Sequence, residues 1–326
     1  MRQVLVPLVA LCLLSCGKQT QQTTVYQQEV TPSVTFNADS AYEYVRAQVD
    51  FGPRVPGSES HSKCLDYMVG KLRSLGAEVE VQEGMGTAYD GTPQRIRNVI
   101  ASFLPEKANR VLLSSHWYSR PFADHDADEK LRDTPISGAN DGASGVGVLI
   151  EVARQLQQKA PSVGVDIVLF DAEDGGTPDH KKNVPYRPDT WCVGSQFWGK
   201  SELGKGVQHR FGILLDMVGA PHAIFPVEQY SKSKAPDVVE KVWGMAERLG
   251  HGGYFVRDMG GYITDDHLYV NNLTEVPMVD IIHYEPGSAV GFCKTWHTQQ
   301  DVIDNISKET LAVVGETVLA VVYAEK

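Results

Sequence analysis

The feature that most constrains this chain is a set of short apolar runs that each end in histidine or acidic residues. The runs and the polar residues after them are Leu112–Ser115 before His116, Val168–Phe170 before Asp171–Asp174, and Ile213–Leu215 before Asp216. Segments with helical spacing separate the runs, most clearly over 143–158. Continuous apolar strands that alternate with helices are typical of a sheet covered on both faces. The sequence therefore predicts an α/β fold: a three-layer sandwich with a central mixed, mostly parallel sheet flanked by helices.

The same periodicity gives a coarse map of one domain. Strands are expected at 78–81, 96–103, 110–115, 165–170, 212–218 and 277–282, and helices at 40–49, 61–75, 143–158, 236–250 and 307–324. No repeat, linker or change of composition interrupts residues 35–326. We therefore expect 35–326 to form a single catalytic domain, although 326 residues would also allow two small domains.

The first 34 residues have the pattern of an export and anchoring segment. A charged start and an apolar run from Val4 to Leu14 are typical of a secretory signal peptide, and the run is too short for a membrane span. Leu13-Leu14-Ser15-Cys16 resembles a bacterial lipobox, in which Cys16 would carry the lipid. We therefore predict a lipoprotein signal peptide at 1–15, a flexible tether at 16–34, and an exported protein on the periplasmic side of a membrane.

Charge and cysteine content narrow the classes of partner. The 30 Lys and Arg residues stand against 41 Asp and Glu, a formal net charge of -11, which disfavours nucleic acid as a partner. Outside the leader, Cys64, Cys192 and Cys293 are odd in number and have no metal-like spacing. At most one disulfide is possible, and we interpret all three as small buried side chains.

Several candidate ligands are expected to meet at one edge of the sheet, because ligand sites of such sheets lie beyond the carboxyl ends of the strands. A glycine-rich turn at 138–145 brings Asp141 toward that edge, and Trp296 and His297 follow a late loop. Taken singly, each acidic residue is as well explained as a helix or turn cap. Together, two or three carboxylates and an imidazole favour a catalytic Zn²⁺ with one open coordination position.

The order of these residues resembles the zinc aminopeptidase clan over 98–305, and within it the bacterial type II glutaminyl cyclases. The segments that carry the resemblance are Phe170–Asp174, Leu214–Pro221, Asp265-Asp266-His267 and Trp296-His297-Thr298. A glutaminyl cyclase converts an N-terminal Gln, and more weakly Glu, into pyroglutamate. The resemblance thus implies one zinc per chain and a substrate that is the N-terminal Gln of a peptide or exported protein.

Residue by residue, the resemblance also implies roles in the site. They are Asp141, Asp174 and His297 as zinc ligands, Glu173 as general acid and base, Asp216 and Asp266 as a carboxylate pair near the leaving group, and Trp191 and Trp296 as pocket walls. Adjacent residues at a strand end point in opposite directions, which supports different tasks for Glu173 and Asp174.

Two alternatives stay open at this point. An exported aminopeptidase with two zinc ions would use His116 and Asp216 for the second metal, although His116-Trp117-Tyr118 departs from the clan's His-x-Asp. A surface lipoprotein could also keep the fold without catalysis. The acidic segment 120–135 is expected to be a solvated loop, the usual state of a charge run.

Overall fold

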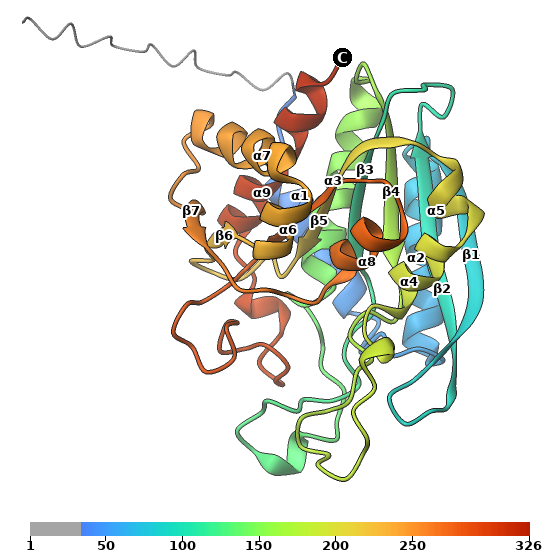
Figure 1. The fold of residues 1–326 in the computed structure, drawn as a ribbon, viewed down its shortest axis with the longest axis vertical. Coiled ribbons are helices and arrows are strands. Elements are labelled where there is room, and N and C mark those ends of the chain that lie inside the picture. Colours follow the sequence, from blue (N-terminus) through green and yellow to red (C-terminus); the bar gives the residue numbers. More distant parts are fainter. Residues whose placement is uncertain (1–33) are drawn as a thin grey trace, which may run out of the picture.

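Six strands form one sheet in the order β1-β2-β4-β3-β5-β8, in a computed structural model that describes residues 34–326 (Figure 1). The strands are β1 (Glu78–Thr87), β2 (Pro93–Phe103), β3 (Arg110–His116), β4 (Gly164–Phe170), β5 (His209–Asp216) and β8 (Met278–Ile282). Strands β4, β3, β5 and β8 pair in parallel, whereas β2 runs antiparallel to both β1 and β4. The predicted mixed, mostly parallel sheet is confirmed. The predicted signal peptide and nearly all of the tether lie outside the described residues.

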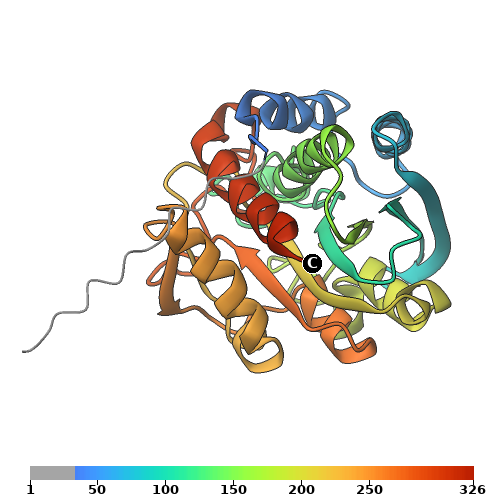
Figure 2. The same ribbon diagram turned by 90° about the horizontal axis from the view of Figure 1, so that it is seen from above.

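Helices cover both faces of the sheet, as the three-layer prediction requires. The helices are α1 (Ala38–Val49), α2 (Glu59–Ser74), α3 (Ala143–Gln158), α4 (Val193–Lys200), α5 (Glu202–Gly206), α6 (Gln229–Lys234), α7 (Pro236–Arg248), α8 (Asp266–Leu273) and α9 (Lys308–Ala324), with short 3-10 turns η1 (Glu129–Leu131), η2 (Pro188–Thr190) and η3 (Ile303–Asn305). Figure 2 shows blue α1, green α3 and red α9 on one side of the sheet, with yellow α5 and orange α8 on the other.

Alternation along the central strands explains why both faces need helices. In β3, Val111 and Leu113 join the large core under α1, α3 and α9, whereas Leu112 joins a second cluster with Trp198 of α4. In β5, Ile213 likewise joins the large core and Leu214 joins the second cluster. Successive side chains of a strand point to opposite faces, so an unbroken apolar run is stable only between two helical layers.

Some elements differ from the sequence-based map. Strand β1 continues to Thr87 instead of ending at residue 81, through Gly84 and Gly86. A Cβ added at Gly84 would lie 2.2 Å from the ring of Phe197 in α4, so the strand can pass this helix only with glycine there. A separate two-stranded sheet, β6 (Phe225–Val227) with β7 (Phe255–Met259), was not predicted.

Two sequence-based expectations concern single features of the domain. Cys64, Cys192 and Cys293 are buried and free, in agreement with their interpretation as small buried side chains. Across residues 34–326, the structure has no helix with both the length and the apolar character to cross a bilayer.

Candidate active site

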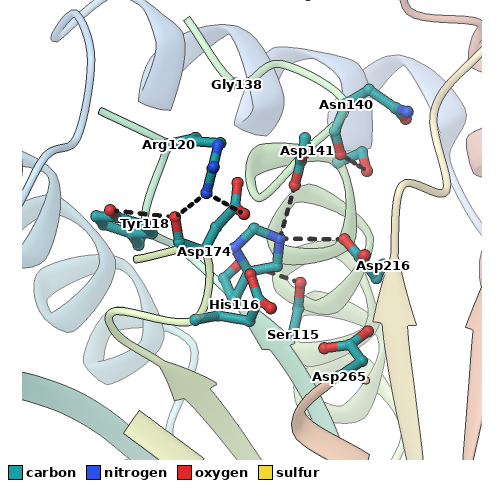
Figure 3. Close-up of polar contacts among 12 residues, drawn as sticks. Ser115, His116, Tyr118, Arg120, Gly138, Asn140, Asp141, Asp174, Asp216 and Asp265 are labelled. Atoms are coloured by element: carbon teal, nitrogen blue, oxygen red, sulfur yellow. Dashed lines mark hydrogen bonds and ion pairs between the residues drawn. The ribbon is translucent and has the colours of Figure 1, made fainter. Parts of the chain in front are cut away.

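The carboxyl ends of β3, β4 and β5 place three groups of polar residues at one edge of the sheet (Figure 3). His116 is the last residue of β3 and pairs in register with Phe170, the last residue of β4. Asp216 ends β5. Because the three strands are parallel neighbours, residues separated by about a hundred positions along the chain meet within hydrogen-bond distance.

Asp141, Asp174 and His297 converge on one point, as expected from the sequence. Nε2 of His297 lies 3.0 Å from Oδ2 of Asp174 and 3.5 Å from Oδ2 of Asp141. All three residues are buried, and neither Oδ2 atom has a hydrogen-bond partner among residues 34–326. Two carboxylate oxygens and one imidazole nitrogen with free lone pairs form a donor set that suits zinc. The residues present therefore fit the expected metal.

Tight turns present these ligands. Asp141 precedes Gly142, which begins α3 with φ +106° and passes so close to Tyr118 that a Cβ would lie 2.4 Å from its carbonyl oxygen. Asp301 accepts hydrogen bonds from the backbone N–H groups of Asn140 and Asp141 at 2.7 and 3.1 Å. These two hydrogen bonds hold the backbone of Asp141 in place and thereby orient its carboxylate.

Four non-glycine residues around the site have left-handed backbone conformations. They are Ala172, Cys192, Met217 and His297, with φ between 48° and 53°. Ala172 turns the chain after β4, where its N–H donates to Oδ1 of Asp171 at 2.9 Å. Glu173 and Asp174 follow directly on this turn, so the backbone geometry decides where both carboxylates point.

Arg120 and Asp124 contact two of the proposed ligands, Asp174 and His297. Arg120 donates to Asp124 through Nε and Nη2 at 2.8 and 2.6 Å, and through Nη1 to the carbonyl oxygen and Oδ1 of Asp174 at 2.9 and 3.2 Å. Oδ1 of Asp124 lies 3.3 Å from Nδ1 of His297, the ring nitrogen opposite the metal-facing Nε2. Burial would raise the pKa of Asp124, but the hydrogen bonds from Arg120 and His297 hold it well below its usual range. A carboxylate–histidine contact of this kind orients a metal ligand.

These contacts correct the expectation that 120–135 is a solvated loop. Arg120, Asp124 and Asp126 are buried. The backbone N–H of Gln299, two residues after His297, donates to Oδ2 of Asp126 at 3.0 Å. Charges in this segment are paired with one another and with the site, so the run of acidic residues reflects internal ion pairs as well as solvent exposure.

Glu173 points away from its neighbour Asp174. Its Oε1 lies 3.4 Å from Sγ of Cys192, while Asp174 faces His297. Burial and the charge of Asp174 raise the pKa of Glu173 well above its usual value. A carboxyl group with a raised pKa holds its proton more readily, which suits a residue that must both accept and release a proton.

His116 joins two carboxylates beside the metal ligands. Its Nε2 lies 3.1 Å from Oδ1 of Asp141 and 3.0 Å from Oδ1 of Asp216 (Figure 3). Burial opposes protonation of this ring, but the hydrogen bonds with Asp141 and Asp216 outweigh it and raise the pKa of His116 well above its usual value. The same three residues have the donor atoms that a second metal would need.

Asp265 and Asp266 begin α8, and they lie differently toward Asp216. Burial, and next the charge of Asp216, raise the pKa of Asp265 to about 7. For Asp266, the charges of Asp265 and His116 affect the pKa more than that of Asp216. Asp265, to which the sequence analysis gave no role of its own, lies near Asp216 in the site (Figure 3). The consecutive acidic residues 265 and 266 were a visible signal, but the sequence could not tell which one faces the site.

Trp191 and Trp296 line one pocket, as predicted. The pocket has a volume of about 520 Å³, and Tyr262, Ile263 and Phe292 contribute to its walls. Trp296 stacks on His297 with ring centroids 3.6 Å apart, and the guanidinium of Arg120 lies 4.9 Å from the Trp191 ring. Trp296 therefore contacts one proposed zinc ligand directly, and Trp191 contacts Arg120, which donates to a second one, Asp174.

Comparison with known proteins identifies the family. Residues 98–322 match peptidase family M28. The chain belongs to this family. A glutaminyl cyclase of Tannerella forsythia is similar in structure, with a TM-score of 0.88 and 54% identity, over 90% of this chain and all of that chain. A zinc-dependent exopeptidase of Parabacteroides distasonis is similar at a TM-score of 0.87 and 52% identity, over 90% of this chain and 99% of the other. A glutaminyl-peptide cyclotransferase of Drosophila melanogaster is 25% identical over 80% of this chain and 75% of its own length.

Proposed function

We propose that this chain is a zinc-dependent glutaminyl-peptide cyclotransferase, which converts an N-terminal Gln, and more weakly Glu, into pyroglutamate. The observation that carries the proposal is the pocket that Trp191 and Trp296 line, because Trp296 stacks directly on His297. Aromatic walls next to a buried proton-transfer group suit the side chain of one terminal residue. The resemblance to glutaminyl cyclases supports the same substrate class.

Asp141, Asp174 and His297 would hold the zinc, since their donor atoms converge and two of them have free lone pairs. When bound there, zinc supplies a Lewis acid that polarises the γ-carbonyl of the substrate side chain. We infer one zinc per chain. The segment His116-Trp117-Tyr118 supports this count, because it lacks the acidic residue two positions after the histidine that would orient a ligand of a second metal.

Glu173 would transfer the proton of the reaction. Its carboxylate takes the proton that the substrate's α-amine loses as it attacks the side-chain carbonyl carbon, Cδ, and then delivers it to the amide nitrogen, which departs from Cδ as ammonia. Burial, and next the charge of Asp174, raise the pKa of Glu173, which favours its protonated form. Nucleophile and carbonyl belong to the same substrate residue, so Trp191 and Trp296 act by holding its folded-back conformer.

Asp216, together with Asp265 and Asp266, would lie near the leaving group of the substrate. These carboxyl groups are buried, and burial raises the pKa of each. Like charges this close cannot all ionise, so the group carries protons that hydrogen-bond acceptors of the substrate can use. The predicted pair of Asp216 and Asp266 thereby becomes a group of three carboxyls.

The decisive experiment measures metal content and activity on one preparation of residues 31–326. We expect one zinc per chain and release of ammonia from Gln-initiated peptides, with Leu-initiated peptides left intact. Two tightly held zinc ions with hydrolysis of Leu-peptides, and no ammonia from Gln-peptides, would contradict the proposal.

An exopeptidase with two metal ions is the second candidate function. The group formed by His116, Asp141 and Asp216 supports it, because these residues lie close enough to share an ion. Similarity to the Parabacteroides distasonis exopeptidase supports it as well. The substrate comparison above separates the two functions, because only a peptidase needs a water nucleophile and releases the terminal residue.

We also propose that the protein is an exported bacterial lipoprotein, anchored to a membrane through Cys16 and facing the periplasm. The support is the lipobox-like sequence before Cys16, which lies outside the described residues. Cells fed a labelled fatty acid should yield a labelled protein, and Cys16→Ser should abolish the label. An unlabelled wild-type protein in the cytoplasmic fraction would refute the anchor.

A further inference from the structure

A second cluster of possible metal donors lies beside the proposed zinc site and shares none of its ligands. Glu173 follows β4, Cys192 immediately precedes α4, and Asp265 immediately precedes α8. One donor atom from each residue lies within 4.8 Å of the others, and all three residues are buried. Three elements far apart in the sequence thus bring a thiol and two carboxyl groups together.

The spacing of two of these donors matches that of ligands on one ion. Sγ of Cys192 lies 3.4 Å from Oε1 of Glu173. In tetrahedral zinc coordination, a sulfur at about 2.3 Å and an oxygen at about 2.0 Å from the metal are about 3.5 Å apart. The pair could therefore bind a thiophilic cation with little rearrangement of the backbone.

The third residue offers an unused donor atom. Oδ1 of Asp265 accepts the N–H of Asp266 at 2.5 Å, while Oδ2 has no hydrogen-bond partner within residues 34–326. Asp265 is only 2% exposed, so water does not readily satisfy this oxygen. A buried carboxylate oxygen without a partner is costly, and either a proton or a cation would relieve that cost.

Two residues of the substrate pocket are chain neighbours of this cluster. Trp191 and Thr264 both line the pocket, and each directly precedes a member of the cluster, Cys192 and Asp265. The cluster therefore lies one residue behind the pocket wall at two points of the chain.

We propose that Glu173, Cys192 and Asp265 form an inhibitory site for a thiophilic divalent cation, such as excess Zn²⁺ or Cd²⁺. Binding releases the thiol proton of Cys192 and any proton on the two carboxyls to solvent, and the thiolate and carboxylates coordinate the ion. The inference rests on the proposed function, because inhibition follows from removing Glu173 from proton transfer. Soft thiolate beside hard carboxylate distinguishes this site from the all-oxygen and nitrogen ligands of the catalytic zinc.

The test titrates Cd²⁺ into the zinc-loaded protein and follows the ultraviolet thiolate-to-cadmium charge-transfer absorption, together with zinc released into the filtrate and activity on Gln-peptides. We expect one added equivalent of Cd²⁺ to produce the absorption without displacing zinc, and activity to fall in proportion. Cys192→Ala should lack the absorption and show an inhibition constant raised at least ~10-fold, since even a lost outer partner typically costs 10–100-fold in metal affinity.

Cys64→Ala is the matched control, because Cys64 is equally buried but packs in the apolar core. It should keep the absorption and the wild-type inhibition constant. Equal absorption or an unchanged inhibition constant in Cys192→Ala, or release of zinc on Cd²⁺ addition, would overturn the inference. The absorption does not depend on turnover. A protein that is inactive on Gln-peptides would refute the proposed function, but the absorption would still show whether Cd²⁺ binds at Cys192.

Discussion

Arg120 binds Asp124 through two hydrogen bonds of 2.8 and 2.6 Å, and this buried pair reaches two of the three proposed zinc ligands. Arg120 contacts Asp174, and Asp124 faces the Nδ1 side of His297. Asp124→Asn should therefore weaken zinc binding by ~10–100-fold, because the histidine loses the carboxylate that orients its ring. Competition with a chelator measures the affinity directly.

Asp128→Asn is the control for this change. Asp128 belongs to the same acidic segment but is exposed and caps only the short η1 turn. Its substitution should leave zinc affinity unchanged. Similar losses in both variants would assign the effect to the general charge of the segment.

Glu173→Gln and Asp174→Asn should separate proton transfer from metal binding. Glu173→Gln should retain zinc and lose ~10²–10⁴-fold in kcat, the usual contribution of a positioned acid or base. Asp174→Asn should lose the zinc itself, since Oδ2 of Asp174 faces Nε2 of His297. The measurement is the zinc content of both purified variants. Loss of zinc in Glu173→Gln with zinc retained in Asp174→Asn would exchange the two roles.

Trp191→Ala should damage catalysis more than folding. Trp191 is half-buried and lines the pocket, whereas Trp198 is fully buried in the core. Trp198→Ala should cost about 3–5 kcal/mol of stability, the usual range for a buried aromatic. Trp191→Ala should instead lower kcat/KM on Gln-peptides with a smaller shift in Tm. A normal kcat/KM in folded Trp191→Ala protein would show that Trp191 has no role in substrate binding.

Asp166 should make stability sensitive to acid. Although burial raises the pKa of Asp166, hydrogen bonds from His209 and Arg110 lower it well below its usual range. Its stabilising effect is therefore complete above the ordinary carboxyl pKa of about 3.9 and is lost as the pH falls further. Asp166→Asn should cost about 3 kcal/mol near neutral pH, and this difference should narrow below about pH 4.

Urea unfolding at several pH values measures that difference. Glu275→Gln changes an exposed carboxyl group and should have the same free energy of unfolding as the wild type at every pH. A gap between wild type and Asp166→Asn that stays constant down to pH 3 would contradict the ionic contribution of Asp166.

The strand ends were predictable because local patterns specify them, whereas the proposed metal ligands were assigned through the family resemblance. Apolar runs locate β3, β4 and β5, and parallel pairing brings whatever follows them to one edge. The helix predicted at 143–158 has the observed bounds of α3, since its periodicity is strong and Lys159 begins an extended segment. Strand alternation predicted opposite directions for Glu173 and Asp174, but both residues lie beyond β4, and the left-handed turn at Ala172 sets their directions.

The supporting residues were not predictable in the same way. Arg120 and Asp124 look like any charge run until the loop that holds them folds over His297. Choosing between Asp265 and Asp266 depends on the rotation of α8 about its axis, which packing against β5 and β8 sets. In both cases the missing information is contact between distant segments, and no short window of sequence contains it.

The left-handed conformations of Ala172, Cys192, Met217 and His297 also bear on how this protein can change. Each such residue typically costs about 1–2 kcal/mol relative to ordinary backbone, so four approach the whole net stability of a domain, about 5–15 kcal/mol. Glycine at Ala172 or Met217 would relieve that cost and would loosen the turn that aims a neighbouring side chain, whereas glycine at His297 would remove a proposed zinc ligand. Engineering for heat resistance and selection for turnover should therefore favour different residues at these four positions.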